Sequence, residues 1–89
     1  MYQRNVVLYT RSHSINGWRA ARFLRRIGCS FEIIDTRLAP ERLVELSKAA
    51  KHKVRVPYVF VDHRPVGGMG MVRKLVGSGT FDRLLHYNL

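Results

Sequence analysis

The sequence has one cysteine, Cys29, and no apolar run long enough to cross a membrane. A single thiol excludes an intramolecular disulfide and a metal site built from several thiolates, so packing alone must stabilise the fold. Near the start, the apolar stretch that follows Arg4 has only four residues, 6–9, which is too short for the core of a signal peptide. These absences predict a cytoplasmic protein without a membrane partner.

Acidic residues are also scarce. The chain has six Asp and Glu against 16 Lys and Arg, which gives a net charge of +10. Such a balance attracts nucleic acid, acidic proteins or small carboxylates. If the segment WRAARFLRR is helical, Arg19, Arg22 and Arg26 share one face. Its apolar residues then face inward: Ala20, Phe23, Leu24 and Ile27. The arginine face is either an ordinary solvated surface or a binding face.

The length of 89 residues fits one domain, 1–89, with one modest core, and we expect a monomer. Any chemistry must then take place in a surface cleft. The four histidines show no metal-ligand spacing, so no metal is expected. They are His13, His52, His63 and His86.

The first half of the chain predicts a β-α-β unit. Residues 5–9 contain an apolar run that begins with two β-branched valines, which is typical of a strand buried on both faces. Ser14 is a good helix N-cap, and Gly28 ends the helix that follows. A second strand is predicted over 30–35, and the intervening helix makes the two strands parallel neighbours.

The second half adds a helix, a hairpin and two further helices. Pro40 lies in the first turn of a helix, and residues 56–66 indicate two strands joined by a tight turn. A helix follows Gly68, and a last helix is predicted over 80–87 with Thr80 as its cap. The predicted order is β-α-β-α-β-β-α-α.

Four pieces of the sequence resemble the glutaredoxin family, a branch of the thioredoxin-like fold. They are VVLYTRSHS (6–14), VPYVFV (56–61), VGG (66–68) and GTFDRLL (79–85). Together they span nearly the whole chain in the family's order. The resemblance implies an α/β thioredoxin-like domain, with a four-stranded mixed sheet flanked by helices. It also implies glutathione-dependent thiol-disulfide exchange in a cleft beside a cis-proline.

The family's Cys-Pro-Tyr-Cys motif falls on Ser14, Ile15, Asn16 and Gly17, so both cysteine positions are replaced. Ser14 takes the nucleophilic position and Gly17 the resolving one. A serine hydroxyl is negligibly ionised at neutral pH and does not exchange with disulfides as a thiolate does. We therefore expect a redox-inactive protein that keeps a cleft for thiol or peptide binding. Alternatively, Ser14 is an introduced substitution in an active single-cysteine protein.

No other residue replaces the missing nucleophile. Cys29 lies beyond the far end of the predicted helix, roughly 20 Å from Ser14. His13 beside Ser14 suggests a hydrolase, but adjacent residues of an extended loop point apart and no carboxylate stands near in the sequence. Iron-sulfur binding between two subunits, known for single-cysteine relatives, would need the thiolate and is not expected.

The resemblance implies a glutathione site formed by Arg11, Asn16, Lys53, Val56, Pro57, Gly68, Met69 and Gly70. In it, the main chain of Val56 pairs with the ligand, provided that the bond to Pro57 is cis. Relatives hold the γ-glutamyl ammonium with Asp or Ser after the Gly-Gly turn, whereas Met69, Gly70 and Met71 follow here. Glutathione binding should therefore be weakened or altered.

Two other functions remain open. The first is a basic nucleic-acid-binding module on the same fold, in which Trp18, Tyr58 and Tyr87 would stack on bases. Because the positive charge is scattered, we expect such binding to be non-specific at most. The second is an adaptor that docks acidic proteins through the Val56–Pro57 cleft and the basic helix.

Overall fold

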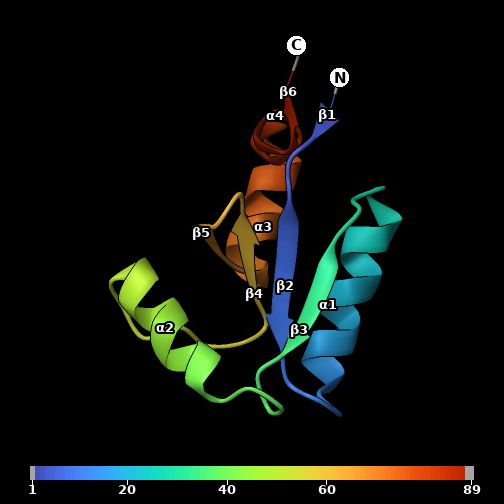
Figure 1. Cartoon of the computed structure of the whole chain (residues 1–89). Coiled ribbons are helices and arrows are strands. Elements are labelled where there is room, and N and C mark those ends of the chain that lie inside the picture. The colour runs from blue at the N-terminus through green and yellow to red at the C-terminus, as the bar shows by residue number, and fades with distance from the viewer. Residues whose placement is uncertain (1, 88–89) are drawn as a thin grey trace.

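The computed structural model describes residues 2–87, which form a four-stranded sheet flanked by helices (Figure 1). The sheet has the order β3-β2-β4-β5. Its strands are β2 (Val6–Thr10), β3 (Glu32–Asp35), β4 (Tyr58–Val61) and β5 (Arg64–Gly68). The β2 and β3 strands are parallel, and the other two pairs are antiparallel. The predicted mixed sheet and element order are confirmed.

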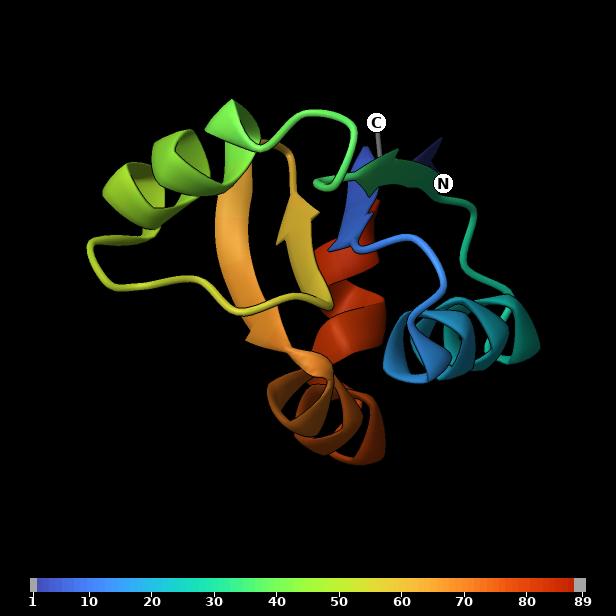
Figure 2. The same ribbon diagram turned by 90° about the horizontal axis from the view of Figure 1, so that it is seen from below.

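Helices cover both faces of the sheet (Figure 2). One face carries α1 (Ile15–Arg26) and α3 (Met69–Gly77), and the other carries α2 (Glu41–Ala50). Successive side chains of a strand point to opposite faces. Val6 and Leu8 therefore join the core beneath α1 and α3, whereas Val7 and Tyr9 pack with residues of α2.

Both predicted ends of α1 are confirmed. The Ser14 hydroxyl accepts a hydrogen bond from the Gly17 N–H at 3.1 Å, as an N-cap does. Ile27 is the C-cap, and Gly28 follows with a left-handed φ of 78° that suits glycine. The arginine face lies in solvent, while Ala20 and Leu24 are buried.

The prediction for residues 80–87 was wrong in part. The helix α4 spans only Thr80–Leu85, and β6 (His86–Tyr87) pairs with β1 (Tyr2–Gln3). The Arg4 N–H donates to the Leu85 carbonyl, so pairing with the start of the chain replaces the last helical turn.

Two local boundaries also differ from the prediction. Gly79, rather than Thr80, occupies the N-cap position of α4, with a left-handed φ of 79°. The second strand begins at Glu32 instead of residue 30. Ser30 is outside it because its main chain exchanges two hydrogen bonds with the Gln3 side chain.

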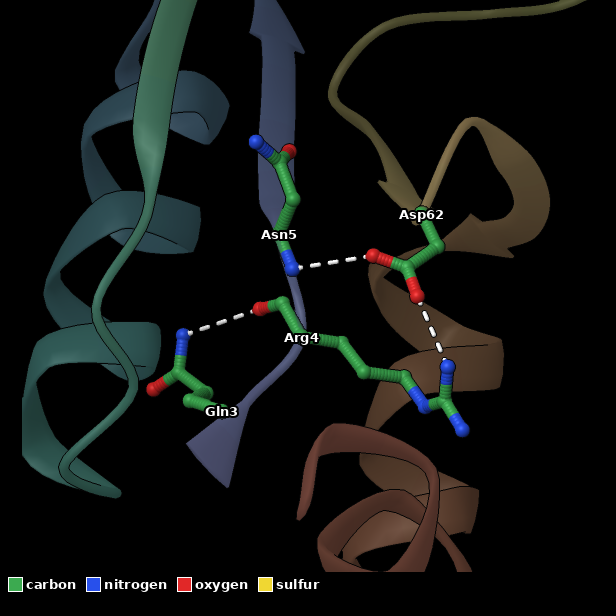
Figure 3. Close-up of polar contacts among 4 residues, drawn as sticks. All are labelled: Gln3, Arg4, Asn5 and Asp62. Carbon is green, nitrogen blue, oxygen red and sulfur yellow. Dashed lines mark hydrogen bonds and ion pairs between the residues drawn. The ribbon is translucent and has the colours of Figure 1, made fainter. Parts of the chain in front are cut away.

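A polar network joins β2 to the β4–β5 turn at the end of the sheet opposite Ser14 (Figure 3). Asp62 accepts from the Arg4 guanidinium at 2.8 Å and from the Asn5 N–H at 3.1 Å. Gln3 donates to the Arg4 carbonyl at 3.3 Å. The hydrogen bond from Arg4 is the main cause that holds the pKa of Asp62 below its ordinary value. This network fixes the tight turn predicted for the hairpin, with Asp62 and His63 at positive φ.

Candidate functional site

The loop between β2 and α1 is held against the end of β3. The Ser12 N–H donates to the Asp35 carboxylate at 3.0 Å, and the Ser12 hydroxyl also bonds to that carboxylate. The Thr36 hydroxyl donates to the Thr10 carbonyl at 2.9 Å. These hydrogen bonds at Thr10 and Ser12 hold the loop that leads to Ser14 at the start of the helix.

A small pocket opens where the starts of α1 and α3 meet the segment before β4. The Val56–Pro57 peptide bond is cis, as the resemblance implies. Pro57 is in the wall of this pocket, whose volume is about 260 Å³. Its lining residues are Asn16, Arg19, Ala20, Pro57, Met69 and Arg73. We call it the cis-proline pocket.

The main chain of Val56 lies just before the start of the central strand β4, outside the strand pairing of the sheet. Strand pairing begins one residue after Pro57, with Tyr58 opposite Tyr9. A Cβ atom placed on Gly68 would lie 3.7 Å from the Pro57 carbonyl oxygen, so the Gly-Gly turn closely approaches the cis-proline. The Val56–Pro57 segment and the Gly-Gly turn are therefore separated in the sequence but adjacent in the fold.

The structure brings some of the expected glutathione-site residues together and leaves others apart. Asn16, Pro57 and Met69 line the cis-proline pocket, and Arg11 and Gly70 are exposed outside its lining. Lys53 lines a different, largely apolar pocket beside α2. The glutathione contact expected for Lys53 stays a prediction.

Two lining residues were missed as site residues by the sequence analysis. Arg19 was assigned only to the exposed arginine face, and Arg73 was not singled out. Arg73 follows Met69 by four residues, a spacing that places both on one face of a helix. That spacing was the available signal.

Comparison with known proteins was informative only at the level of structure. No protein-family model matches the sequence, and no curated protein matches it. The solution structure of a Brucella melitensis glutaredoxin is 28% identical with a TM-score of 0.73, over 96% of this chain and 91% of that one. The buckwheat glutaredoxin-glutathione complex is 16% identical with a TM-score of 0.81, over 92% and 76% of the two chains.

The holo form of glutaredoxin C1 from Populus tremula x tremuloides gives a TM-score of 0.78 at 18% identity, over 91% of this chain and 82% of that one. The chain has a glutaredoxin fold. This agrees with the fold expected from the residues at the first strand, the Val-Pro segment and the Gly-Gly turn.

In this glutaredoxin fold, Ser14 acts as a helix cap. Its hydroxyl accepts from Gly17, and among residues 2–87 no hydrogen bond joins it to a histidine. His13 is exposed and has a left-handed φ of 62°. The site therefore lacks the histidine-to-serine hydrogen bond with which a hydrolase would activate a serine.

Gly17 permits a close approach between α1 and the end of β2. A Cβ atom added at Gly17 would lie only 2.0 Å from the Thr10 Oγ1 atom. That oxygen is buried and has no hydrogen-bond partner among the described residues. A second cysteine at Gly17 would therefore collide with Thr10 in its present position.

The single thiol of this glutaredoxin fold lies in the core. Cys29 is 6% exposed and packs in the cluster beneath α1 and α3. Burial raises the pKa of the Cys29 thiol to about 11, so the thiol is protonated at neutral pH. A protonated, buried thiol is a poor nucleophile.

We expect Cys29 to resist iodoacetamide at about pH 8 in the folded protein and to react once urea unfolds it. Because folding raises its pKa from 9.0 to about 11, the stability from the neutral thiol is complete below pH 9 and declines as pH rises through that window. The decline is at most about 1.4 kcal/mol per pH unit. Urea unfolding of the protein and of Cys29→Ala across this range measures it. Rapid alkylation of the folded protein at pH 8 would contradict the assignment.

Other kinds of site are not found in the described part of the chain. Within residues 2–87, no three His, Cys, Asp or Glu side chains gather as a metal site would require. None of the helices there has the length and apolar character needed to span a bilayer.

Proposed function

We propose that this protein is a redox-inactive relative of the glutaredoxins that binds glutathione, or an extended peptide, in the cis-proline pocket. The observation that carries the proposal is the separation of thiol and pocket. Ser14 caps the helix next to the pocket, while Cys29 is buried beyond the other end of that helix. Thiol-disulfide exchange requires an accessible thiolate, and binding does not.

The main chain around the pocket supports recognition of a peptide. Val56 lies outside the paired residues of β2 and β4, which supports pairing of its N–H and C=O groups with an extended ligand. The α3 helix begins at Met69 without a side-chain cap and with no acidic residue in its first turn. Its first N–H groups can therefore bind a carboxylate.

Charged side chains complete the proposed site. Arg19 and Arg73 line the pocket, and guanidinium groups bind carboxylates through paired hydrogen bonds. Arg11 lies in the loop before α1, and Asn16 lies in the first turn of that helix. The buckwheat neighbour was solved as a glutathione complex, which makes glutathione the first ligand to test. The α3 start offers no carboxylate for the ligand's ammonium group, so we expect weak binding.

Titration with glutathione, followed by NMR, tests this proposal. We expect chemical-shift changes at Asn16, Val56 and Met69. A ligand that leaves the cis-proline pocket unperturbed while shifting other residues would contradict it.

Gly70→Asp should strengthen glutathione binding about three- to tenfold, because it supplies one charge-assisted hydrogen bond to the ammonium group. A Cβ atom at Gly70 meets nothing within 4 Å, so the substitution fits. Gly77→Asp, at the other end of α3, is the matched control because its Cβ also meets open space. Equal effects of the two substitutions would exclude an ammonium contact at the start of α3.

A further inference from the structure

A second depression lies beside the cis-proline pocket and is lined by residues of α1 and α3. These two helices lie on the same face of the sheet (Figure 2). Its volume is about 420 Å³. It is lined by Trp18, Arg19, Arg22, Phe23, Arg26 and Arg73. We call it the arginine groove. Arg19 and Arg73 line both it and the cis-proline pocket, so the two are neighbours.

The positive charge of the arginine groove is not compensated locally. Neither α1 nor α3 contains an acidic residue. The ion pairs of residues 2–87 join Arg4 to Asp62 and His86 to Asp82, outside the groove. Four guanidinium groups therefore line one surface depression without a carboxylate, which concentrates positive potential there.

Two of these arginines are already ordered by aromatic rings. The Arg22 guanidinium carbon lies 5.3 Å from the centre of the Trp18 ring, and that of Arg73 lies 5.4 Å from the centre of the Phe23 ring. A guanidinium stacked in this way keeps its edge N–H groups free to donate. Pre-ordered side chains lose less entropy when a ligand binds.

We propose that the arginine groove binds an acidic segment of a partner polypeptide, whose neighbouring residues occupy the cis-proline pocket. This inference rests on the proposed function of that pocket. Paired N–H donors of arginine match the two oxygens of an Asp or Glu side chain. Because groove and pocket share Arg19 and Arg73, an extended chain that pairs with the main chain of Val56 can reach both.

Single-stranded nucleic acid fits the arginine groove less well. Binding of single strands depends on bases that stack on free aromatic faces. The rings of Trp18 and Phe23 are each stacked by an arginine, and no other aromatic residue lines the groove. Each ring has an arginine on one face, and Trp18 remains 59% exposed. The charge thus favours an anion, and the small number of aromatic residues favours carboxylates over a run of stacked bases.

The test measures the affinity of a labelled peptide of eight residues that contains four glutamates, by fluorescence anisotropy at physiological salt. The controls are the same peptide with glutamine and an oligothymidine of equal charge. Trp18 is the only tryptophan, so a change in its emission reports binding at the groove.

Arg22→Gln/Arg26→Gln removes two charges that line the groove but not the cis-proline pocket. Arg37→Gln/Arg42→Gln removes two exposed charges elsewhere and is the matched control. We expect the first pair to weaken binding of the acidic peptide about tenfold or more and the second less than about twofold.

Equal losses in both double variants, or no binding of the acidic peptide, would overturn the inference. Tighter binding of the oligothymidine with the same dependence on Arg22 and Arg26 would replace it with a nucleic-acid function. Glutathione titration of the same variants separates the two proposals. Glutathione binding without peptide binding overturns only the groove, and groove-dependent peptide binding without glutathione binding overturns only the glutathione site.

Discussion

Ser14→Cys is expected to show measurable glutathione-dependent thiol-disulfide exchange, which we expect the unmodified chain to lack. The Ser14 oxygen already accepts from the Gly17 N–H at the start of α1. A sulfur at this place would meet the same donor and the positive end of the helix, which stabilise a thiolate. Its pKa should fall below the ordinary value of about 8.5. If it reaches about 7, as in thioredoxin, roughly half of the thiol is ionised at neutral pH.

The assay compares the unmodified chain with Ser14→Cys on a glutathione mixed disulfide, and thiolate absorbance gives the pKa of the new thiol. Ser14→Cys/Cys29→Ala is the control that assigns any signal to position 14. Activity of the unmodified chain would show that the nucleophile is misplaced. A folded Ser14→Cys whose thiol is unperturbed and inert would show that the cis-proline pocket serves another purpose.

Gly17→Ala is expected to destabilise the protein by about 1–3 kcal/mol, the usual range for overpacking a well-packed site. In an exposed helix the same change stabilises by roughly 0.5–1 kcal/mol, so the sign is diagnostic. The cause is the collision of a new Cβ with Thr10 Oγ1 at 2.0 Å. Urea unfolding measures the free energy.

Thr10→Ala should rescue most of that loss, because the Thr10 Cβ atom would remain 3.3 Å from the added methyl group. It also removes a buried hydroxyl that has no partner among the described residues. The parent, the two single variants and Gly17→Ala/Thr10→Ala form a double-mutant cycle. Its coupling energy measures the contribution of the collision. Gly70→Ala, in open space, is the control. If Gly17→Ala is no less stable than the parent, the Thr10 side chain rotates away from the new methyl group. The contact with Thr10 then does not require glycine at position 17.

The helix from Ser14 to Gly28 was predictable because its cap, apolar face and stop signal are local. The strand pairing of residues 2–3 with 86–87 was not, since two-residue strands have no periodicity. Only the family resemblance predicted that Asn16, Pro57 and Met69 lie close together. A local sequence pattern does not indicate which distant segments come into contact. The place of Lys53, which lines a pocket beside α2, was also not predictable, because the segment between α2 and β4 has no periodic pattern.

The pairing of β1 with β6 places Tyr2 opposite Tyr87 (Figure 1). Ser14 and the cis-proline pocket lie at the other end of β2, where α1 begins. A short peptide linker could therefore join residues 87 and 2, and new ends could be opened at a surface loop. Attachment to a fluorophore, a resin or a second domain through this edge would leave the proposed binding surface facing away from the attachment point.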